Sequence, residues 1–370
     1  MTRVVVVGAG LLGSSVAYHA AIAGGDVVVV ERATPGAGTS GASFAWVNAQ
    51  DKTPAGYFAL NADGVAEHRA LAERIGGDWY HSGGDLVIGR GAQAEKLREK
   101  VERHRALAYP VRLLDRAQLA TLEPAIDPGA DDVVAHFPDE AWIDAPALVE
   151  RLLDAAEAAG ARRSVGAAVE GFERDSTGAV TGVRLANGAS EEGDVVVIAA
   201  GPATGALATL VGLSLPMAPS PGLLAVTTPV SAGIGRVVHA GDVALRPERG
   251  GRILLSSRSV DAALDPATRS VDPADPACAE LLGRAAHVVP SLRDARIEEA
   301  RIGVRSVPVD GFPAVGFVPA APGCYVVVSH SGATLTPILG RLVAVEVLGT
   351  PQPRLDPWRP ARFVAEGVTT

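Results

Sequence analysis

The sequence predicts a mixed α/β protein, α+β overall, in which a parallel-sheet domain is divided between the two ends of the chain and a mainly antiparallel β-sheet domain is inserted into it. Three observations carry this prediction. A strand–helix–strand unit occupies residues 4–31, a β-rich section covers about 217–260, and a strand at 325–328 precedes a helix at 338–348. A plain dinucleotide-binding dehydrogenase would more often complete its six parallel strands in succession, so this order favours a split domain.

The first unit carries a glycine-rich turn between its first strand and its helix. Gly8, Gly10 and Gly13 form a Gly-x-Gly-x-x-Gly pattern, which permits a tight turn, the close approach of a pyrophosphate and close packing of the helix. Glu31 ends the second strand 18 residues after Gly13, where a carboxylate accepts hydrogen bonds from a ribose and repels a 2′-phosphate. The unit predicts a Rossmann-like dinucleotide site and disfavours NADP, but by itself it leaves NAD and FAD open.

Composition excludes several classes of protein. A chain of 370 residues with 48% hydrophobic residues and 20% charged residues is expected to form two well-buried domains. The net charge of −9 provides no basic field for nucleic acid. Cys278 and Cys324 are far apart, so neither a disulfide framework nor a metal site is expected. No apolar run reaches the roughly 20 residues of a membrane span, and no signal peptide precedes the first strand, so a cytoplasmic location is expected.

The remaining elements follow in chain order. A loop of small residues at 34–43 follows the second strand, and its glycines and hydroxyls suit a nearby ligand. Asp144 is placed to cap a helix that begins near residue 148. Helical spacing is present at 55–75, 93–107, 148–159 and about 275–287, and strand patterns are present at 83–89, 165–172, 180–185, 195–200 and 251–255.

Four segments, in this order, resemble the FAD-dependent amine and amino-acid oxidases, a family that includes D-amino-acid oxidase, glycine oxidase and monomeric sarcosine oxidase. They are the Val4–Glu31 unit, the Thr39-Ser40 loop, the strand that ends Ala199-Ala200-Gly201-Pro202, and a C-terminal pair, 303–316 and 330–337. The resemblance covers nearly the whole chain and implies FAD as the cofactor. It also implies an FAD-binding domain built from residues 1–50, 140–215 and 300–370, and a substrate domain built from 51–139 and 216–299.

The resemblance implies a set of cofactor-binding residues. One group would hold the adenosine diphosphate half, a second would line the path to the flavin, and a third would lie at the pyrimidine edge of the flavin beside a helix N-terminus. In chain order these residues are Gly8, Gly10, Gly13, Glu31, Arg32, Thr39, Ser40, Ser43, Val169, Ala200, Gly201, Gly332, Thr334, Leu335 and Thr336.

The resemblance also assigns the substrate site. Arg305 matches the position whose guanidinium binds the substrate carboxylate, and a planar fork of donors suits that bidentate contact. Arg246 and Arg258 are candidates for a second cation in the pocket, with a structural ion pair as the alternative for each. His239 and Trp46 are candidate pocket walls, although such residues more often serve packing.

The implied reaction is hydride transfer from the carbon beside the amine to flavin N5, hydrolysis of the imine, and reoxidation by O2 to H2O2. The substrate would be a small amino acid or an N-substituted glycine, as for a glycine oxidase. The sequence departs from sarcosine oxidase in two respects. Gly303-Val304-Arg305 occupies the place just before the 308–311 segment where sarcosine oxidase has the cysteine that binds its flavin, so FAD is expected to be noncovalent, and no lysine follows Lys100 to activate oxygen. A dehydrogenase that passes electrons to a quinone or carrier, and a non-catalytic flavin-binding subunit, therefore stay open as alternatives.

Overall fold

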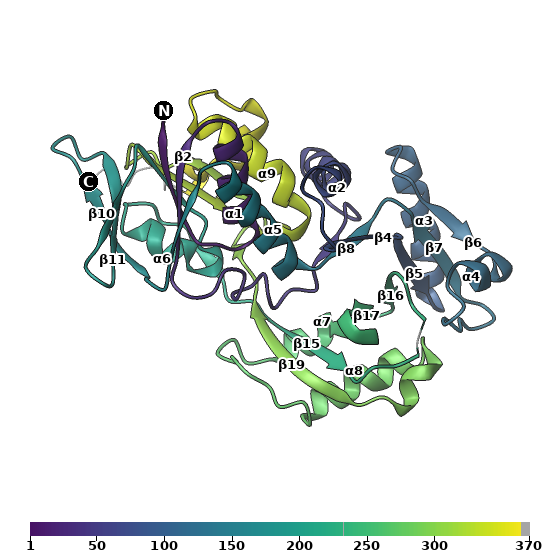
Figure 1. Ribbon diagram of the computed structural model, residues 1–370. Coiled ribbons are helices and arrows are strands. Elements are labelled where there is room, and N and C mark those ends of the chain that lie inside the picture. The colour runs from purple at the N-terminus through teal and green to yellow at the C-terminus, as the bar shows by residue number, and fades with distance from the viewer. Residues whose placement is uncertain (232, 364–370) are drawn as a thin grey trace, which may run out of the picture.

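The computed structural model describes residues 1–231 and 233–363, and it contains two large sheets that lie side by side (Figure 1). The N-terminal strand and the C-terminal helix belong to the same lobe, whereas residues from the middle of the chain form the other (Figure 1). This arrangement confirms the predicted α/β fold with an inserted, mainly antiparallel sheet.

The first sheet has six strands in the order β21-β22-β13-β1-β2-β9. All neighbouring pairs are parallel except the pair at the β21 edge. Its central strands are nearly continuous runs of buried valine, as is typical of a parallel sheet covered on both faces. The strands are β1 (Arg3–Val7), β2 (Asp26–Glu31), β9 (Arg162–Val165), β13 (Val195–Ile198), β21 (Ala314–Phe317) and β22 (Cys324–Val328).

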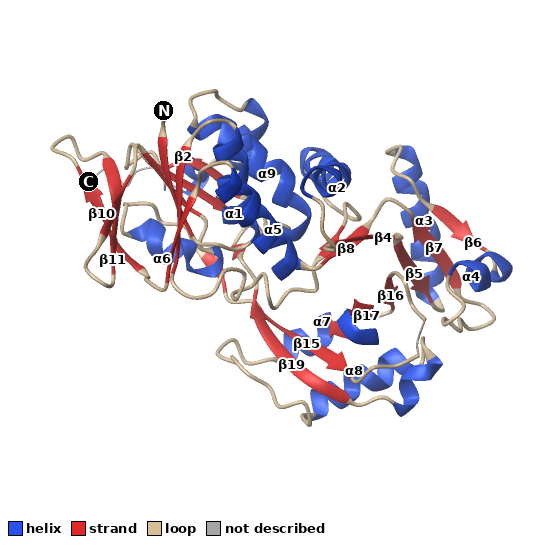
Figure 2. Ribbon diagram, viewed as in Figure 1, coloured by secondary structure: helices blue, strands red, loops and turns tan. Residues whose placement is uncertain are grey.

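Helices cover one face of this sheet, and a small sheet covers the other (Figure 2). The helices are α1 (Leu11–Ile22), α5 (Ala145–Ala158) and α9 (Gly332–Val347), and α2 (Ala55–Ile75) packs against α9. On the opposite face lie β10 (Val169–Arg174), β11 (Val180–Leu185), β12 (Ser190–Glu192) and α6 (Thr204–Thr209).

The second sheet has eight strands in the order β19-β15-β18-β17-β16-β5-β7-β6, and only its β16–β5 pair is parallel. Helix α8 (Pro276–Ala286) covers β17, β18 and β19, while α3 (Ala92–Ala106) packs on β5 and β7. The strands are β5 (Asp85–Gly89), β6 (Arg112–Leu114), β7 (Val133–Phe137), β15 (Pro221–Thr227), β16 (Val237–Ala240), β17 (Val243–Glu248), β18 (Arg252–Ser257) and β19 (Ile297–Val304). The short helices α4 (Arg116–Leu122) and α7 (Arg258–Ala263) flank this sheet.

Short strands join the two lobes. Strands β3 (Trp46–Val47) and β4 (Tyr80–Ser82) pair on either side of β8 (Ala141–Ile143), and β14 (Met217–Ala218) pairs with β20 (Val307–Pro308). Because β8 immediately precedes α5 and β20 follows β19, these strands lie where the chain passes between the two large sheets.

Two predicted elements differ from the structure. The strand expected at 165–172 is divided at Gly166 (φ +92°), and its parts, β9 and β10, belong to different sheets. The final helix begins at Gly332 rather than at Ile338, and it includes Pro337 in its second turn. The predicted domain range 300–370 extends past the described part of the chain, since residues 364–370 lie outside it.

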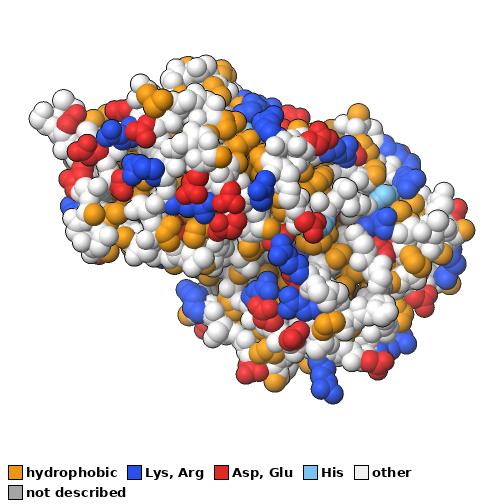
Figure 3. All heavy atoms as spheres, in the orientation of Figure 1, with side chains coloured by type: hydrophobic (Ala, Val, Ile, Leu, Met, Phe, Trp, Pro, Cys, Tyr) orange, Lys and Arg blue, Asp and Glu red, His pale blue; other side chains and the backbone are white. Residues whose placement is uncertain are grey.

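No helix within the described ranges is long and apolar enough to cross a membrane. Acidic and basic side chains are interspersed over the face seen in Figure 3, rather than gathered into a field of one sign.

Candidate active site

A cavity of about 1430 Å³ extends from the glycine-rich turn of the first sheet to the inner surface of the second. This volume exceeds the roughly 300–1,000 Å³ of a pocket for one drug-sized ligand, so it leaves room for a dinucleotide together with a substrate. Most of the residues predicted to bind cofactor or substrate line it. They are Gly8, Gly10, Glu31, Arg32, Thr39, Ser40, Ser43, Trp46, Val169, Ala200, Gly201, His239, Arg258, Arg305, Gly332 and Thr334.

The adenosine end of this cavity is built by the first turn. Gly8 has φ +104°, and a Cβ atom there would lie 2.7 Å from the Ala199 carbonyl oxygen, so the turn requires glycine. A Cβ on Gly13 would collide with the Gly8 carbonyl. Gly13 lies outside the cavity lining, and its role is the close packing of α1 that the sequence predicts.

Glu31 is held in place by the backbone. Its two carboxylate oxygens accept hydrogen bonds from the amides of Ala9 (2.8 Å) and Ala33 (3.0 Å). A carboxylate offers about four acceptor positions, so two remain for ribose hydroxyls. Ser40 accepts a hydrogen bond from the amide of Leu11 (3.1 Å) and thereby connects the small-residue loop to the N-terminus of α1.

The opposite end of the cavity is formed by the N-terminus of α9. Gly332 faces open space, and Ser331, the N-cap residue, makes no side-chain cap hydrogen bond, so the amides of this turn are available to a ligand. The hydroxyl of Thr334 accepts a hydrogen bond from the amide of Asn48 (3.1 Å). Two predicted flavin residues do not reach the cavity: Leu335 is buried in the core, and the Thr336 hydroxyl donates to the Gly332 carbonyl (2.7 Å).

Arg305 lies directly after β19, with its guanidinium at the cavity wall. Nη1 donates to the Pro221 carbonyl (3.0 Å), and Nη2 donates to the carboxylate of Asp261, which is nearly buried. A Cβ on Gly222 would collide with the guanidinium, so this glycine makes room for it. A guanidinium has five N–H donors, and these two contacts leave three for a ligand. The contacts therefore fix the orientation of Arg305 without using all of its donors.

Comparison with known proteins agrees with this geometry. Residues 3–345 match the model of the FAD-dependent oxidoreductase family. The chain belongs to this family. It is 29% identical over 355 residues to a glycine oxidase of Geobacillus kaustophilus (strain HTA426), with 92% of this chain and 91% of that protein covered. It is 27% identical over 365 residues to a glycine oxidase of Pseudomonas aeruginosa, with 96% of this chain and 97% of that protein covered. The crystal structure of glycine oxidase from Geobacillus kaustophilus superposes with a TM-score of 0.85, at 26% identity and over 98% of this chain and 99% of that one.

The family assignment makes FAD the cofactor and the protein an FAD-dependent oxidoreductase. The residues of this chain fit the cofactor, because a Gly8 that tolerates no Cβ, a Glu31 with free acceptor positions and two helix N-termini line one continuous cavity. Neither Cys278 nor Cys324 lines the cavity, and both are buried. This placement favours the predicted noncovalent binding of FAD.

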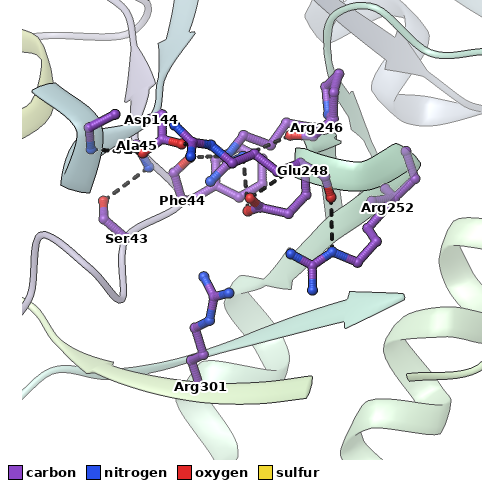
Figure 4. A network of polar contacts seen from close by, with 12 residues as sticks. Ser43, Phe44, Ala45, Asp144, Arg246, Glu248, Arg252 and Arg301 are labelled. Atoms are coloured by element: carbon purple, nitrogen blue, oxygen red, sulfur yellow. Dashed lines mark hydrogen bonds and ion pairs between the residues drawn. The ribbon is translucent and has the colours of Figure 1, made fainter. Parts of the chain in front are cut away.

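Arg246 does not line this FAD-dependent oxidoreductase's cavity. It is 4% exposed, and it donates to the carbonyls of Phe44 and Pro247, each at 2.7 Å. Nη1 also lies 3.3 Å from the Glu248 carboxylate, and the guanidinium stacks 4.6 Å from the centre of the Trp142 ring. Figure 4 shows this network, which connects the loop after Ser43 to the second sheet. The contacts favour the structural alternative for Arg246.

His239 and Trp46 lie together on the cavity wall, with ring centres 4.2 Å apart. His239 Nδ1 lies 2.8 Å from the carboxylate of the buried Asp85. The Gln50 amide joins Asp85 (2.8 Å) to Glu140 (2.7 Å), which also accepts from the Trp46 indole (3.0 Å). A buried polar network thus fixes both pocket-wall residues from behind.

Burial, reinforced by the Asp85 carboxylate, raises the pKa of Glu140 to about 8. Hydrogen bonds donated by Gln50 and by the Tyr109 hydroxyl (2.9 Å) lower the pKa of Glu140 and so act in the opposite direction.

Among the described residues, no group of three or more His, Cys, Asp or Glu side chains is placed to hold a metal ion.

Sequence reasoning missed Lys52, Asp261, Asp85 and Glu140. Lys52 lines the cavity from the loop after β3, although it is remote from the segments in which a pocket lysine was sought. Asp261 follows Arg258 by one turn of α7, but nothing local connects it with Arg305. Only the rarity of lysine in this chain could have drawn attention to Lys52.

Proposed function

We propose that this protein is an amino-acid oxidase of the glycine oxidase type, which oxidises the CH–NH or CH–NH2 group of a small amino acid or N-substituted glycine. The observation that carries the proposal is Arg305, whose guanidinium is fixed by Asp261 and Pro221 and keeps donors free at the cavity. The likeness to glycine oxidases supports it.

In this proposal, the chain's own residues orient the substrate. Arg305 binds the substrate carboxylate through a bidentate contact and so presents the neighbouring C–H bond. Bound FAD supplies a two-electron acceptor for the hydride of the carbon that carries the amine. The N-terminus of α9 favours an electron-rich group beside it through its amides and dipole. His239 and Trp46 form one wall of the substrate space.

The test is anaerobic titration of the purified holoenzyme with glycine, sarcosine, D- and L-amino acids and larger N-carboxymethyl amines. Loss of visible flavin absorbance with a member of this panel, followed by peroxide formation when air is admitted, is the expected result. A flavin that none of these amines reduces would contradict the proposal.

A dehydrogenase that passes electrons to a quinone or carrier is the second candidate. The sequence left this candidate open because no lysine after Lys100 could activate oxygen. Lys52 at the cavity weakens that argument, since it is a lysine within reach of the site. Slow reoxidation of the reduced flavin by air, with fast reoxidation by a quinone, would favour this candidate over the oxidase. A non-catalytic subunit would give no reduction at all.

A further inference from the structure

The cavity wall near the N-terminus of α9 carries more positive charge than its acids balance. Lys52, Arg258 and Arg305 all line this region, together with His330. Asp261 pairs with Arg305 only. Neither Lys52 nor Arg258 has an ion-pair or side-chain hydrogen-bond partner within residues 1–231 and 233–363, whereas Lys100, the other lysine at the cavity, lies 2.7 Å from Asp51. Among the described residues, two cations therefore face the cavity without a directly paired acid.

Lys52 is the more confined of the two. Its side chain is half-buried, and its ammonium lies 6.0 Å from the centre of the Tyr57 ring, whose hydroxyl bonds Ser331 at the start of α9. Burial lowers the pKa of Lys52. The nearby acid Glu140 does not bond Lys52, because its oxygens accept from Trp46, Gln50 and Tyr109. A partly desolvated ammonium without a partner is costly, and an anionic ligand would offset that cost.

Arg258 is the first residue of α7, and Asp261, which holds Arg305, lies three positions later on the same helical face. Arg258 is exposed and lines the cavity, and its charge acts on His330 as that of Arg305 does. His330 adds no positive charge at neutral pH, because burial and the charges of Lys52, Arg305 and Arg258 lower its pKa to about 4. Once a substrate carboxylate has bound Arg305, a cationic surface made by Lys52 and Arg258 remains.

We propose that Lys52 and Arg258 form a second anion subsite, and that the physiological substrate is an amine that carries two carboxylates. Arg305 binds the carboxylate beside the oxidised carbon, and the second subsite binds the distal one. The inference rests on the proposed function for the assignment of Arg305, but the subsite can be tested by binding alone, without turnover.

The probes are two thioethers that lack an oxidisable amine, thiodiacetate with two carboxylates and (methylthio)acetate with one. Each is titrated into the holoenzyme, and the shift in the flavin spectrum gives its Kd. The wild type should bind thiodiacetate roughly 10- to 100-fold more tightly, the range expected for a charge-assisted contact. Lys52→Met and Arg258→Met should each remove most of that preference while changing the Kd of (methylthio)acetate little.

Two further variants serve as controls, one for the charge of Lys52 and one for the loss of a lysine elsewhere. Lys52→Arg keeps the charge and should retain the preference, even if Lys52→Met binds FAD poorly. Lys96→Met removes an exposed lysine of α3 that does not line the cavity, and it should behave as wild type. Equal affinity of the wild type for both thioethers would overturn the proposal, as would an equal loss of both in Lys52→Met. It would also fail if Lys52→Met slowed only the reoxidation by O2, since Lys52 would then serve oxygen rather than substrate.

Failure of the proposed function would be seen in flavin reduction, and not in the binding of the thioethers. In that case neither sarcosine nor iminodiacetate would reduce the flavin under anaerobic conditions, whatever the thioether affinities. If both subsite and function are correct, iminodiacetate should reduce the flavin at lower concentration than sarcosine, and Lys52→Met should reverse that order.

Discussion

Replacing Arg305 by methionine separates substrate binding from structural support. Two contacts hold the guanidinium, one to Asp261 and one to the Pro221 carbonyl, and the donors that remain face the cavity. A charge-assisted hydrogen bond contributes about 1.5–3 kcal/mol, so loss of a bidentate contact to a carboxylate should weaken binding by about 3 kcal/mol or more, at least roughly 100-fold in Kd.

The same substitution should cost stability, because the Asp261 side chain is only 8% exposed and loses its cation. The Arg305 side chain is 34% exposed, so the ion pair is partly screened, and Asp261 keeps its hydrogen bond from the Leu223 amide (2.8 Å). We therefore expect a loss of about 1 kcal/mol in the free energy of unfolding. The double variant Arg305→Met/Asp261→Asn removes both charges and should regain most of that stability, but none of the affinity.

The assay is the Kd of (methylthio)acetate from the flavin spectrum, measured beside urea unfolding of each variant. Arg301→Met is the matched control, because Arg301 lies on the same strand β19, pairs with Glu299 (2.8 Å) and does not line the cavity. If the double variant regained affinity together with stability, or if Arg301→Met weakened binding as strongly, Arg305 would not be the carboxylate anchor.

Three other perturbations test other parts of the site. Gly8→Ala should destabilise the protein by about 1–3 kcal/mol and lower the flavin-to-protein absorbance ratio, since the residue has φ +104° and little room for a Cβ; normal flavin content would contradict this. Arg246→Met should lower the free energy of unfolding by about 3–5 kcal/mol, because it leaves Glu248 without its buried partner, and the Kd of (methylthio)acetate for the folded fraction should stay unchanged. The pKa of Glu140 lies at about 8 in the folded protein against an ordinary 4.5, so the folded state holds a proton that the unfolded chain releases, and stability should fall by about 1.4 kcal/mol per pH unit as pH rises between these values. Urea unfolding of wild type and Glu140→Gln at several pH values isolates this slope, and a difference between them that is independent of pH would show that Glu140 is ionised in the folded protein.

The parts of the site that the sequence predicted are those whose function depends on local backbone geometry. The turn at Gly8 and the carboxylate of Glu31 each follow from a short segment, because a turn and a strand end are determined by neighbouring residues. The helix start at Gly332 does not, since the local pattern placed it at Ile338 and only the family resemblance placed a helix N-terminus beside the flavin. Arg305 was predicted only through the family resemblance. Its partner Asp261 could not be, since the two residues are 44 positions apart and meet only through the packing of α7 on β15.

The loop from Ser43 to Lys52 explains why the substrate side of the cavity was the hardest part to predict. Each of its contacts comes from a different element: Arg246 of β17 binds the Phe44 carbonyl, Thr334 of α9 accepts from the Asn48 amide, and Glu140 accepts from Trp46 and Gln50. No local pattern encodes such a set of long-range contacts, yet together they determine where Trp46 and Lys52 face the cavity. Because this one loop contacts both sheets, a change behind it at Glu140 or Arg246 should alter the affinity for thiodiacetate through the position of Lys52. The Kd of (methylthio)acetate, which binds at Arg305, should stay unchanged. Flavin affinity should then change less than thioether preference, since Glu31 and the first turn are held by contacts that do not involve the loop from Ser43 to Lys52.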